Sequence, residues 1–239
     1  MSSLEQNSTD YFVSLAKAGL GAVPVAGSLL AELAGTVIPN QRIDRLVDFA
    51  RKLEGRIGTL DRATLRTKLT DENFTDLLEE TARHAARAVT DERREYLASL
   101  LSSGITDDRI SFIETKHLLR ILGEINDIEV IWLRFYLHPV IGGDTEFRTK
   151  HAAVLEPVTA AIGSDQSEID RHALQENYQE HLVSLGLLRR PLLIDFKTAA
   201  PTFDKFSGDW KRRPHELTPL GRLLLRYIGF EEEAESPGV

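Results

Sequence analysis

The sequence contains no cysteine, one methionine and two tryptophans among its 239 residues. The absence of cysteine excludes disulfides, cysteine-ligated zinc, iron–sulfur clusters and a thiol nucleophile. Basic residues are outnumbered by acidic ones, 29 against 37, which gives a formal net charge of −8. This acidity argues against coating of nucleic acid over the whole surface, because phosphate binding needs clustered cations, but it leaves a local basic patch open.

The sequence also lacks the short motifs that identify many enzymes. The phosphate-binding G-x-x-x-x-G-K-[ST], the dinucleotide-binding G-x-G-x-x-G and the nucleophile elbow G-x-S-x-G are absent. The seven histidines are scattered, and none has the H-x-x-x-H or H-E-x-x-H spacing of a helical metal site. We therefore predict a non-enzymatic protein with no catalytic residue, no metal, no cofactor and no small-molecule substrate.

No uncharged run is long enough to cross a bilayer as one helix. Residues 18–31 carry no charge, but this span is shorter than the roughly 20 residues that a bilayer needs, and Pro24 interrupts it. Residues 1–10 lack the basic region of a signal peptide. We expect two short helices at about 9–20 and 27–36, which form either a buried hairpin or an element that contacts a membrane or a partner. In the second interpretation, the contact residues are Leu20, Val23, Val25, Leu29, Leu30 and Leu33.

Helical periodicity dominates the sequence from residue 43 onward. Apolar residues recur at i, i+3 and i+4 spacing, and residues that favour helix starts, such as Thr90 and Asn126, precede the periodic segments. The segment 138–147 contains one proline and a pair of glycines, which are typical of a loop. We predict a helical domain at 1–140, a second module at 148–230 and an acidic tail at 231–239.

The last third has a different pattern. A long helix over 166–185 is followed by the extended run LLRRPLLIDFK, the polar loop TAAPTFDKFSGD and a last helix that Thr218-Pro219 begins. The motifs LVSLGLLRR and HELTPLGRLLL resemble the C-terminal halves of bacterial winged-helix regulators. We therefore predict a mainly α fold, a multi-helix domain with a C-terminal winged-helix-like module that contains one β-hairpin near residues 187–217.

The charge of this module is opposite to that of the whole chain. Residues 187–230 contain nine lysines and arginines against four acids. Phosphate contacts or a partner are expected at the wing residues, which are Arg189, Arg190, Trp210, Lys211, Arg212 and Arg213. The helix over 166–185 is acidic, however, where a recognition helix presents Arg, Asn or Gln to bases. A protein-interaction module is therefore favoured, and a winged-helix DNA-binding transcriptional regulator is the alternative.

A second resemblance extends over most of the chain. The apolar start with IPNQRIDRL, the helical middle DERREYLASLLSSGI and the terminal LTPLGRLLLRYIG resemble uncharacterised bacterial helical proteins of the abortive-infection alpha type. This resemblance implies a role in antiphage defence or stress response. We expect a cytoplasmic or peripheral membrane protein that acts through a protein partner, self-association or membrane contact.

Overall fold

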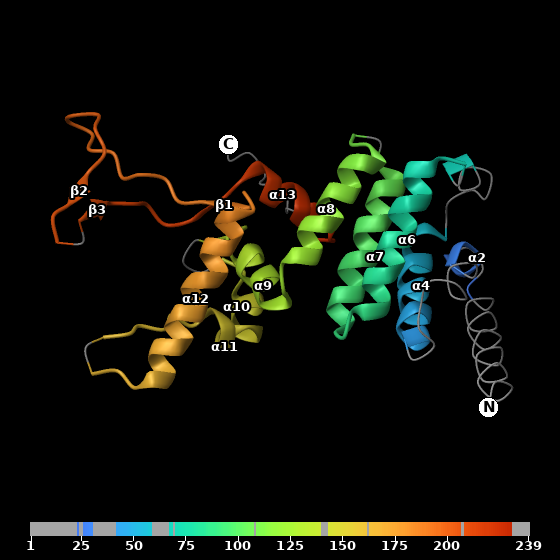
Figure 1. Cartoon of the computed structure of the whole chain (residues 1–239), viewed down its shortest axis with the longest axis horizontal. Helices are drawn as coiled ribbons and strands as arrows, with labels where there is room; N and C mark the ends of the chain where they lie inside the picture. Colours follow the sequence, from blue (N-terminus) through green and yellow to red (C-terminus); the bar gives the residue numbers. More distant parts are fainter. Residues whose placement is uncertain are drawn as a thin grey trace, which may run out of the picture. The chain divides into compact units, whose positions relative to one another are not determined.

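The computed structural model describes residues 23, 26–30, 42–58, 67–68, 70–107, 109–139, 143–161, 163–206 and 208–230 (Figure 1). Its described parts are mainly helical, with short antiparallel strand pairings near the C-terminus, which confirms the predicted mainly α class and the C-terminal hairpin. The chain divides into two compact units. The first comprises Met1–Glu124 with Tyr227–Gly229, and the second comprises Ile125–Arg226 with Phe230–Val239.

The first unit is built from amphipathic helices. Their bounds are α2 (Ala26–Leu30), α4 (Ile43–Ile57), α6 (Glu72–Arg87), α7 (Asp91–Thr106) and α8 (Phe112–Glu124). Helix α4 packs against α2, α6 and α7, and α6 also packs against α8. The apolar stripes meet in a core that includes Phe49, Leu53, Phe74, Leu77 and Leu100, all fully buried. Burial of each such side chain contributes roughly 1.5–3 kcal/mol, so packing holds these helices together.

The helix starts follow the expected capping chemistry. The Thr90 hydroxyl accepts a hydrogen bond from the Arg93 N–H at 3.2 Å, as the sequence predicts for the start of α7. Helix α6 begins at Glu72, where the Asp71 carboxylate caps it by accepting from the Asn73 N–H at 2.8 Å. The end of α7 is held by the Asp107 carboxylate, which accepts a hydrogen bond from the Tyr227 hydroxyl at 3.1 Å.

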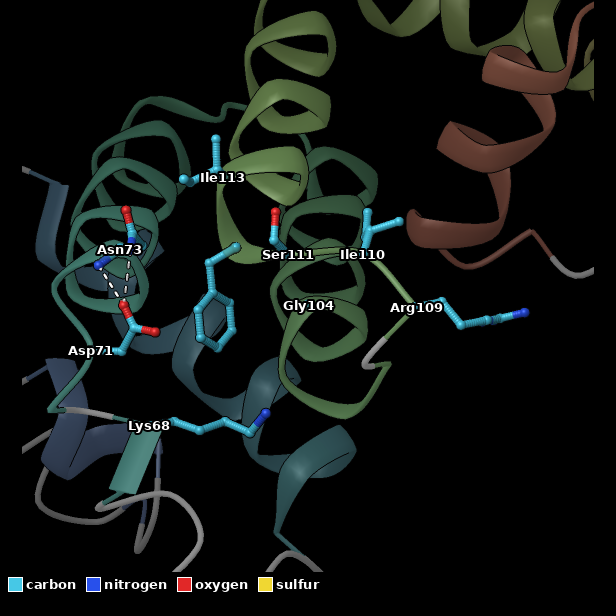
Figure 2. Close-up of a pocket in the computed structure, with 9 residues that line it drawn as sticks. Lys68, Asp71, Asn73, Gly104, Arg109, Ile110, Ser111 and Ile113 are labelled. Atoms are coloured by element: carbon cyan, nitrogen blue, oxygen red, sulfur yellow. Dashed lines mark hydrogen bonds between the residues drawn. The ribbon is translucent and has the colours of Figure 1, made fainter.

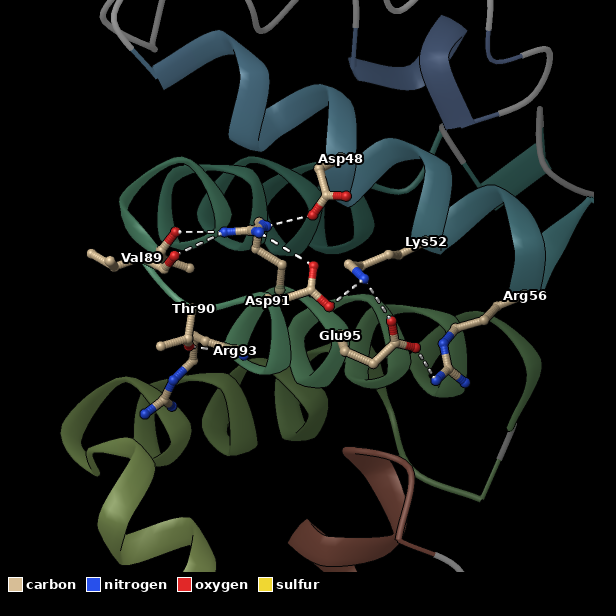
Figure 3. A network of polar contacts seen from close by, with 10 residues as sticks. Asp48, Lys52, Arg56, Val89, Thr90, Asp91, Arg93 and Glu95 are labelled. Carbon is tan, nitrogen blue, oxygen red and sulfur yellow. Dashed lines mark hydrogen bonds and ion pairs between the residues drawn. The ribbon is translucent and has the colours of Figure 1, made fainter.

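A ladder of ion pairs joins α4 to α7 (Figure 3). Lys52 lies between the carboxylates of Asp91 and Glu95, at 3.0 and 3.3 Å, and Glu95 also accepts from Arg56 at 2.6 Å. Partial burial alone would lower the pKa of Lys52, but the hydrogen bonds to Asp91 and Glu95 outweigh it and raise the pKa. In addition to the apolar interface, the ladder therefore fixes the register of α4 against α7.

The second unit combines helices with an extended β region. Its helices are α9 (Asp127–Phe135), α10 (Thr145–Lys150), α11 (Ala152–Leu155), α12 (Gln166–Ser184) and α13 (Pro219–Tyr227), whose last residue belongs to the first unit. Its strands are β1 (Leu188–Arg189), β2 (Phe203–Asp204), β3 (Asp209–Trp210) and β4 (Glu216–Leu217). The short helices α10 and α11 end at Leu155, because Pro157 disfavours helical geometry at the residue before it.

Helix α9 explains where the two units divide. The loop at 138–147 is the boundary that the sequence predicts, whereas the division lies between Glu124 and Ile125. Helix α9 packs against α12, and the buried Glu129 carboxylate contacts the His181 Nδ1 at 2.6 Å. The other Glu129 oxygen accepts from the Asn126 N–H, which completes a capping box at the start of α9. These contacts place α9 with the second unit.

Candidate interaction surface

The base of the β region is a short, well-anchored strand pair. Strands β1 and β4 are antiparallel, with Leu188 opposite Leu217 and Arg189 opposite Glu216. Leu188 and Leu217 are buried. The Thr218 hydroxyl donates to the Gly186 carbonyl at 2.7 Å, so the residue that begins α13 also fixes the end of the hairpin. The base is therefore a rigid support for the residues between the two strands.

Residues 190–215, which we call the arm, extend beyond this base (Figure 1). Three backbone hydrogen bonds connect its segments in a cycle. The Leu193 N–H donates to the Lys211 carbonyl at 2.8 Å, the Lys211 N–H to Thr202 at 2.8 Å, and the Thr202 N–H to Leu193 at 2.9 Å. Strands β2 and β3 pair with Phe203 opposite Trp210. Backbone hydrogen bonds thus hold the arm together. Most of its described side chains are exposed, and none is buried.

The arm carries exposed aromatic side chains on two turns. Phe196 lies in the first turn, which is closed by a hydrogen bond from the Asp195 N–H to the Ala200 carbonyl. Phe206 lies in the second turn, which is closed by a hydrogen bond from the Gly208 N–H to the Asp204 carbonyl. Both phenylalanine side chains are wholly exposed, at 103%. Single exposed apolar residues are common, but two fully exposed phenyl rings on one short arm indicate a contact surface.

Between these turns, Phe203 and Trp210 form a cross-strand aromatic pair. Their ring centroids are 5.3 Å apart in an edge-to-face arrangement, and the two residues are 48% and 46% exposed. Such a pair stabilises the hairpin by about 0.5–1 kcal/mol. Trp210 is one of the wing residues predicted from the sequence, and the structure places it in the middle of the arm.

The predicted wing arginines at the base are already paired. Arg189 and Arg213 both bind the Glu216 carboxylate, at 2.8 and 3.2 Å. Arg190 lies 3.3 Å from Glu180 on α12. Exposed pairs of this kind contribute little to stability, about 0–1 kcal/mol, but they reduce the local positive charge. These three arginines are therefore less available to phosphate than their spacing in the sequence suggests.

The remaining predicted cations lie farther along the arm. Lys211 is 4.0 Å from the Asp204 carboxylate and remains exposed. Arg212 forms a β-bridge with Leu192 and is exposed, and within the described residues it has no ion pair. The wing residues thus divide into a paired group at the base and a solvent-facing group on the arm.

The predicted N-terminal contact residues are only partly described. Val23 is 5% exposed and Leu30 is fully buried, and helix α2 packs against α4. The Ala26 N–H donates to the Glu54 carboxylate at 2.7 Å, which ties α2 to α4. At these two positions the buried hairpin is the interpretation that the packing favours. Leu20, Val25 and Leu33, together with the side chain of Leu29, lie outside the described residues.

The sequence reasoning missed the phenylalanines at the two turns. The composition of TAAPTFDKFSGD predicts a polar loop, and Phe196 belongs to the extended run before it. One signal was available, because each ring has a lysine beside it in the sequence, as Phe196-Lys197 and as Lys205-Phe206.

The first unit has a hollow of about 380 Å³ near the starts of α6 and α8 (Figure 2). Asp71 and Asn73 line it, but they hydrogen-bond to each other. Ser111 also lines it, and its N–H and hydroxyl both donate to the Glu114 carboxylate. The neighbouring Arg109 binds Asp107 at 2.7 Å. These polar groups serve the local helix ends, so the hollow provides no argument for a ligand.

Comparison with known proteins finds no matching family model, no matching curated protein and no matching solved structure. Among the described residues, no helix is both long enough and apolar enough to cross a membrane. Within the same residues, no group of three or more His, Asp or Glu side chains is arranged to hold a metal ion. The geometry of the arm is therefore the main basis for an inference about function.

Proposed function

We propose that this chain is a non-enzymatic binding protein that uses the arm as its docking surface. The observation that carries the proposal is the complete exposure of Phe196 and Phe206 on the two turns of the arm. Covering a phenyl ring removes a large apolar area from water, at roughly 25 cal/mol per Å², so both rings gain free energy when a partner covers them. The backbone bonds of the arm hold the turns in place before contact, which reduces the entropy cost of docking.

Placement of a photoreactive residue at the turns tests this proposal directly. The photoreactive p-benzoylphenylalanine can replace Phe196 or Phe206 in the full chain, because both side chains are wholly exposed and leave room for the added benzoyl group. We expect irradiation in cells to give covalent adducts at both positions. The matched controls place the same residue at Val89, Ile113 and Leu174, which are 77%, 65% and 53% exposed but lie on helices or helix ends outside the arm.

The adduct yield at the control positions shows whether the reaction is specific to the arm. Adducts at the arm well above those at the three control positions support a docking surface. Equal labelling at all five positions would mean that exposure alone explains the reaction, and the proposal would then be wrong. The chemical class of the adduct, whether protein, lipid or nucleic acid, is identified separately by mass spectrometry.

The resemblance to abortive-infection alpha proteins supports a biological setting for such binding. We propose that the docking contributes to antiphage defence or stress response in a bacterial cell. Phage plating on cells that express the chain should show a lower efficiency than on cells without it. A Phe196→Ser/Phe206→Ser variant should restore plating if the arm performs the contact, whereas unchanged protection would separate the defence role from the arm.

A further inference from the structure

The charge beside the two exposed rings limits what the arm can bind. Lys197 follows Phe196 and Lys205 precedes Phe206, and both lysines are exposed. Residues 191–213 contain five cations and three acids, a local charge of 5 − 3 = +2 within a chain of −8. Each ring at a turn is therefore next to an exposed cation in the sequence.

The acids of the arm are engaged by its own backbone. The Asp195 carboxylate accepts from the Lys197 N–H at 2.7 Å, and the Asp204 carboxylate accepts from the Phe206 N–H at 2.9 Å. Asp209 accepts from the Trp210 N–H at 2.7 Å. These carboxylates shape the turns in the way that is usual for aspartate. They keep their negative charge, so what favours an anionic surface is the excess of two cations over residues 191–213.

The exposure of the rings argues against stacking on nucleic acid. Proteins that bind single strands combine aromatic side chains, on which successive bases stack, with a positively charged groove that follows the backbone. At 103% exposure, neither face of Phe196 or Phe206 is covered. A ring of this kind is suited to insertion into an apolar medium that closes around it on all sides.

We propose that the arm docks on an anionic lipid bilayer. Phe196 and Phe206 enter the boundary between headgroups and acyl chains, and Lys197 and Lys205 bind the lipid phosphates. Aromatic rings favour this boundary, and cations beside it gain from the negative surface potential of an anionic leaflet. The half-exposed Trp210 and Phe203 lie on the paired strands of the same arm. This inference rests on the proposed function, because it identifies the partner of the same arm.

Trp210 provides a direct reporter for the test. The chain has only two tryptophans, so Trp132→Phe leaves Trp210 as the single indole. Trp132 is 5% exposed, and phenylalanine keeps an aromatic ring at this buried position. We expect the full chain to float with vesicles of phosphatidylcholine and phosphatidylglycerol, and its fluorescence to shift to the blue. Vesicles of phosphatidylcholine alone should give neither response at low salt.

Variants of the turns separate the contribution of the inserted rings from that of the lysines. Phe196→Ser/Phe206→Ser should lower the partition coefficient at least about tenfold, because the inserted rings are lost. Lys197→Gln/Lys205→Gln should lower it roughly thirtyfold on anionic vesicles at low salt, and less at high salt. Ile113→Ser and Leu174→Ser, at exposed positions outside the arm, should leave it unchanged. All four variants change exposed side chains, and circular dichroism checks that each remains folded.

Other occupants of the arm give different results. Competition by free glycerol phosphate, with the same shift of Trp210, would identify a site for soluble phosphate and overturn the bilayer proposal. Binding of oligothymidylate without binding of vesicles would identify a nucleic-acid surface. A dimer in sedimentation equilibrium that Phe196→Ser/Phe206→Ser dissociates, with no flotation, would identify a second copy of the chain as the partner.

The two proposals fail in distinguishable ways. If vesicles are not bound but the photoreactive residues at 196 and 206 form protein or nucleic-acid adducts, the bilayer proposal is wrong and the docking function remains. If those positions react no more than the control positions, both proposals are wrong. Lipid adducts together with flotation on anionic vesicles support both.

Discussion

At the scale of single residues, Gly221 shows how a missing side chain sets the base of the arm. The Gly221 N–H donates to the Thr218 hydroxyl at 3.0 Å, and the turn of α13 that results brings Gly221 against the backbone of Leu187. A Cβ atom at this position would lie 2.4 Å from the Leu187 carbonyl oxygen. The glycine in the motif HELTPLG is therefore required by close backbone approach.

Gly221→Ala should lower the stability of the folded chain by about 2 kcal/mol, because a backbone carbonyl cannot move aside as a flexible side chain can. Gly55→Ala on α4 is the matched control, since nothing lies within 4 Å of its added methyl group. The control should stabilise the chain by up to about 1 kcal/mol through helix propensity. Thermal unfolding of the two variants compares them, and equal effects would contradict the steric argument.

Two partly buried histidines make stability depend on pH. Burial lowers the pKa of His84 and of His215, and Arg190 lowers that of His215 further while Glu180 opposes the change. The unfolded chain, in which both pKa values are about 6.5, then binds more protons in mildly acidic solution. Their contribution to stability is complete above pH 6.5 and is lost as the pH falls through the lower folded values.

Urea unfolding at a series of pH values from neutral to mildly acidic tests this expectation. The midpoint should fall with the pH below about 6.5, before the carboxylates titrate. A His84→Gln/His215→Gln variant should show a weaker dependence in the same range. If the variant keeps the full dependence, other groups are responsible for it.

At the scale of elements, the contact between α4 and α7 combines an apolar interface with a polar ladder. Arg94 has a side chain that is 13% exposed, and it binds Asp48 of α4 (Figure 3). It also donates to the carbonyls of Ala88 and Val89, at 3.1 and 3.3 Å, just beyond the end of α6. One guanidinium thus joins three segments that are separate in the sequence.

Arg94→Ala should therefore destabilise the chain by about 2 kcal/mol, because a mostly buried carboxylate pair and two carbonyl contacts are lost together. Arg83→Ala is the matched control. Its side chain is 49% exposed, and among the described residues it pairs only with Glu79 one turn away on the same helix, at 3.2 Å, so its loss should cost about 0.5 kcal/mol or less. Chemical denaturation measures both, and a similar loss for the two variants would show that the ladder adds nothing to the apolar interface.

At the scale of the whole molecule, charge is distributed unevenly. The net charge of −8 conceals a charge of +2 over residues 191–213, and α12 carries four acids against one arginine. The three base arginines of the wing are paired with Glu216 or Glu180. The alternative function, a winged-helix regulator of transcription, would require this acidic helix to lie in the major groove.

Duplex DNA should therefore bind weakly and without a strong dependence on salt. A fluorescence-anisotropy titration of the full chain at two salt concentrations measures this. The variant Lys211→Gln/Arg212→Gln/Arg213→Gln should change the result little. Tight binding that weakens steeply with salt and disappears in the variant would instead favour the regulator.

The sequence by itself determined the local features of this protein. Periodicity predicted α4 at 43–57, and the capping residues Thr90, Asn126 and Thr218 mark where α7, α9 and α13 begin. It also predicted the hairpin near the C-terminus. These features follow from interactions within a few residues, so they can be predicted from the sequence alone.

Only the tertiary structure decided which side chains remain in contact with water. The pairing of Arg189 with Glu216 and of Arg190 with Glu180 joins residues that are 27 and 10 positions apart. The burial of Leu30 depends on the packing of α2 on α4, and the exposure of Phe196 and Phe206 depends on turns that extend beyond the helices. Burial and pairing are set by the whole set of neighbours, which composition and spacing do not specify.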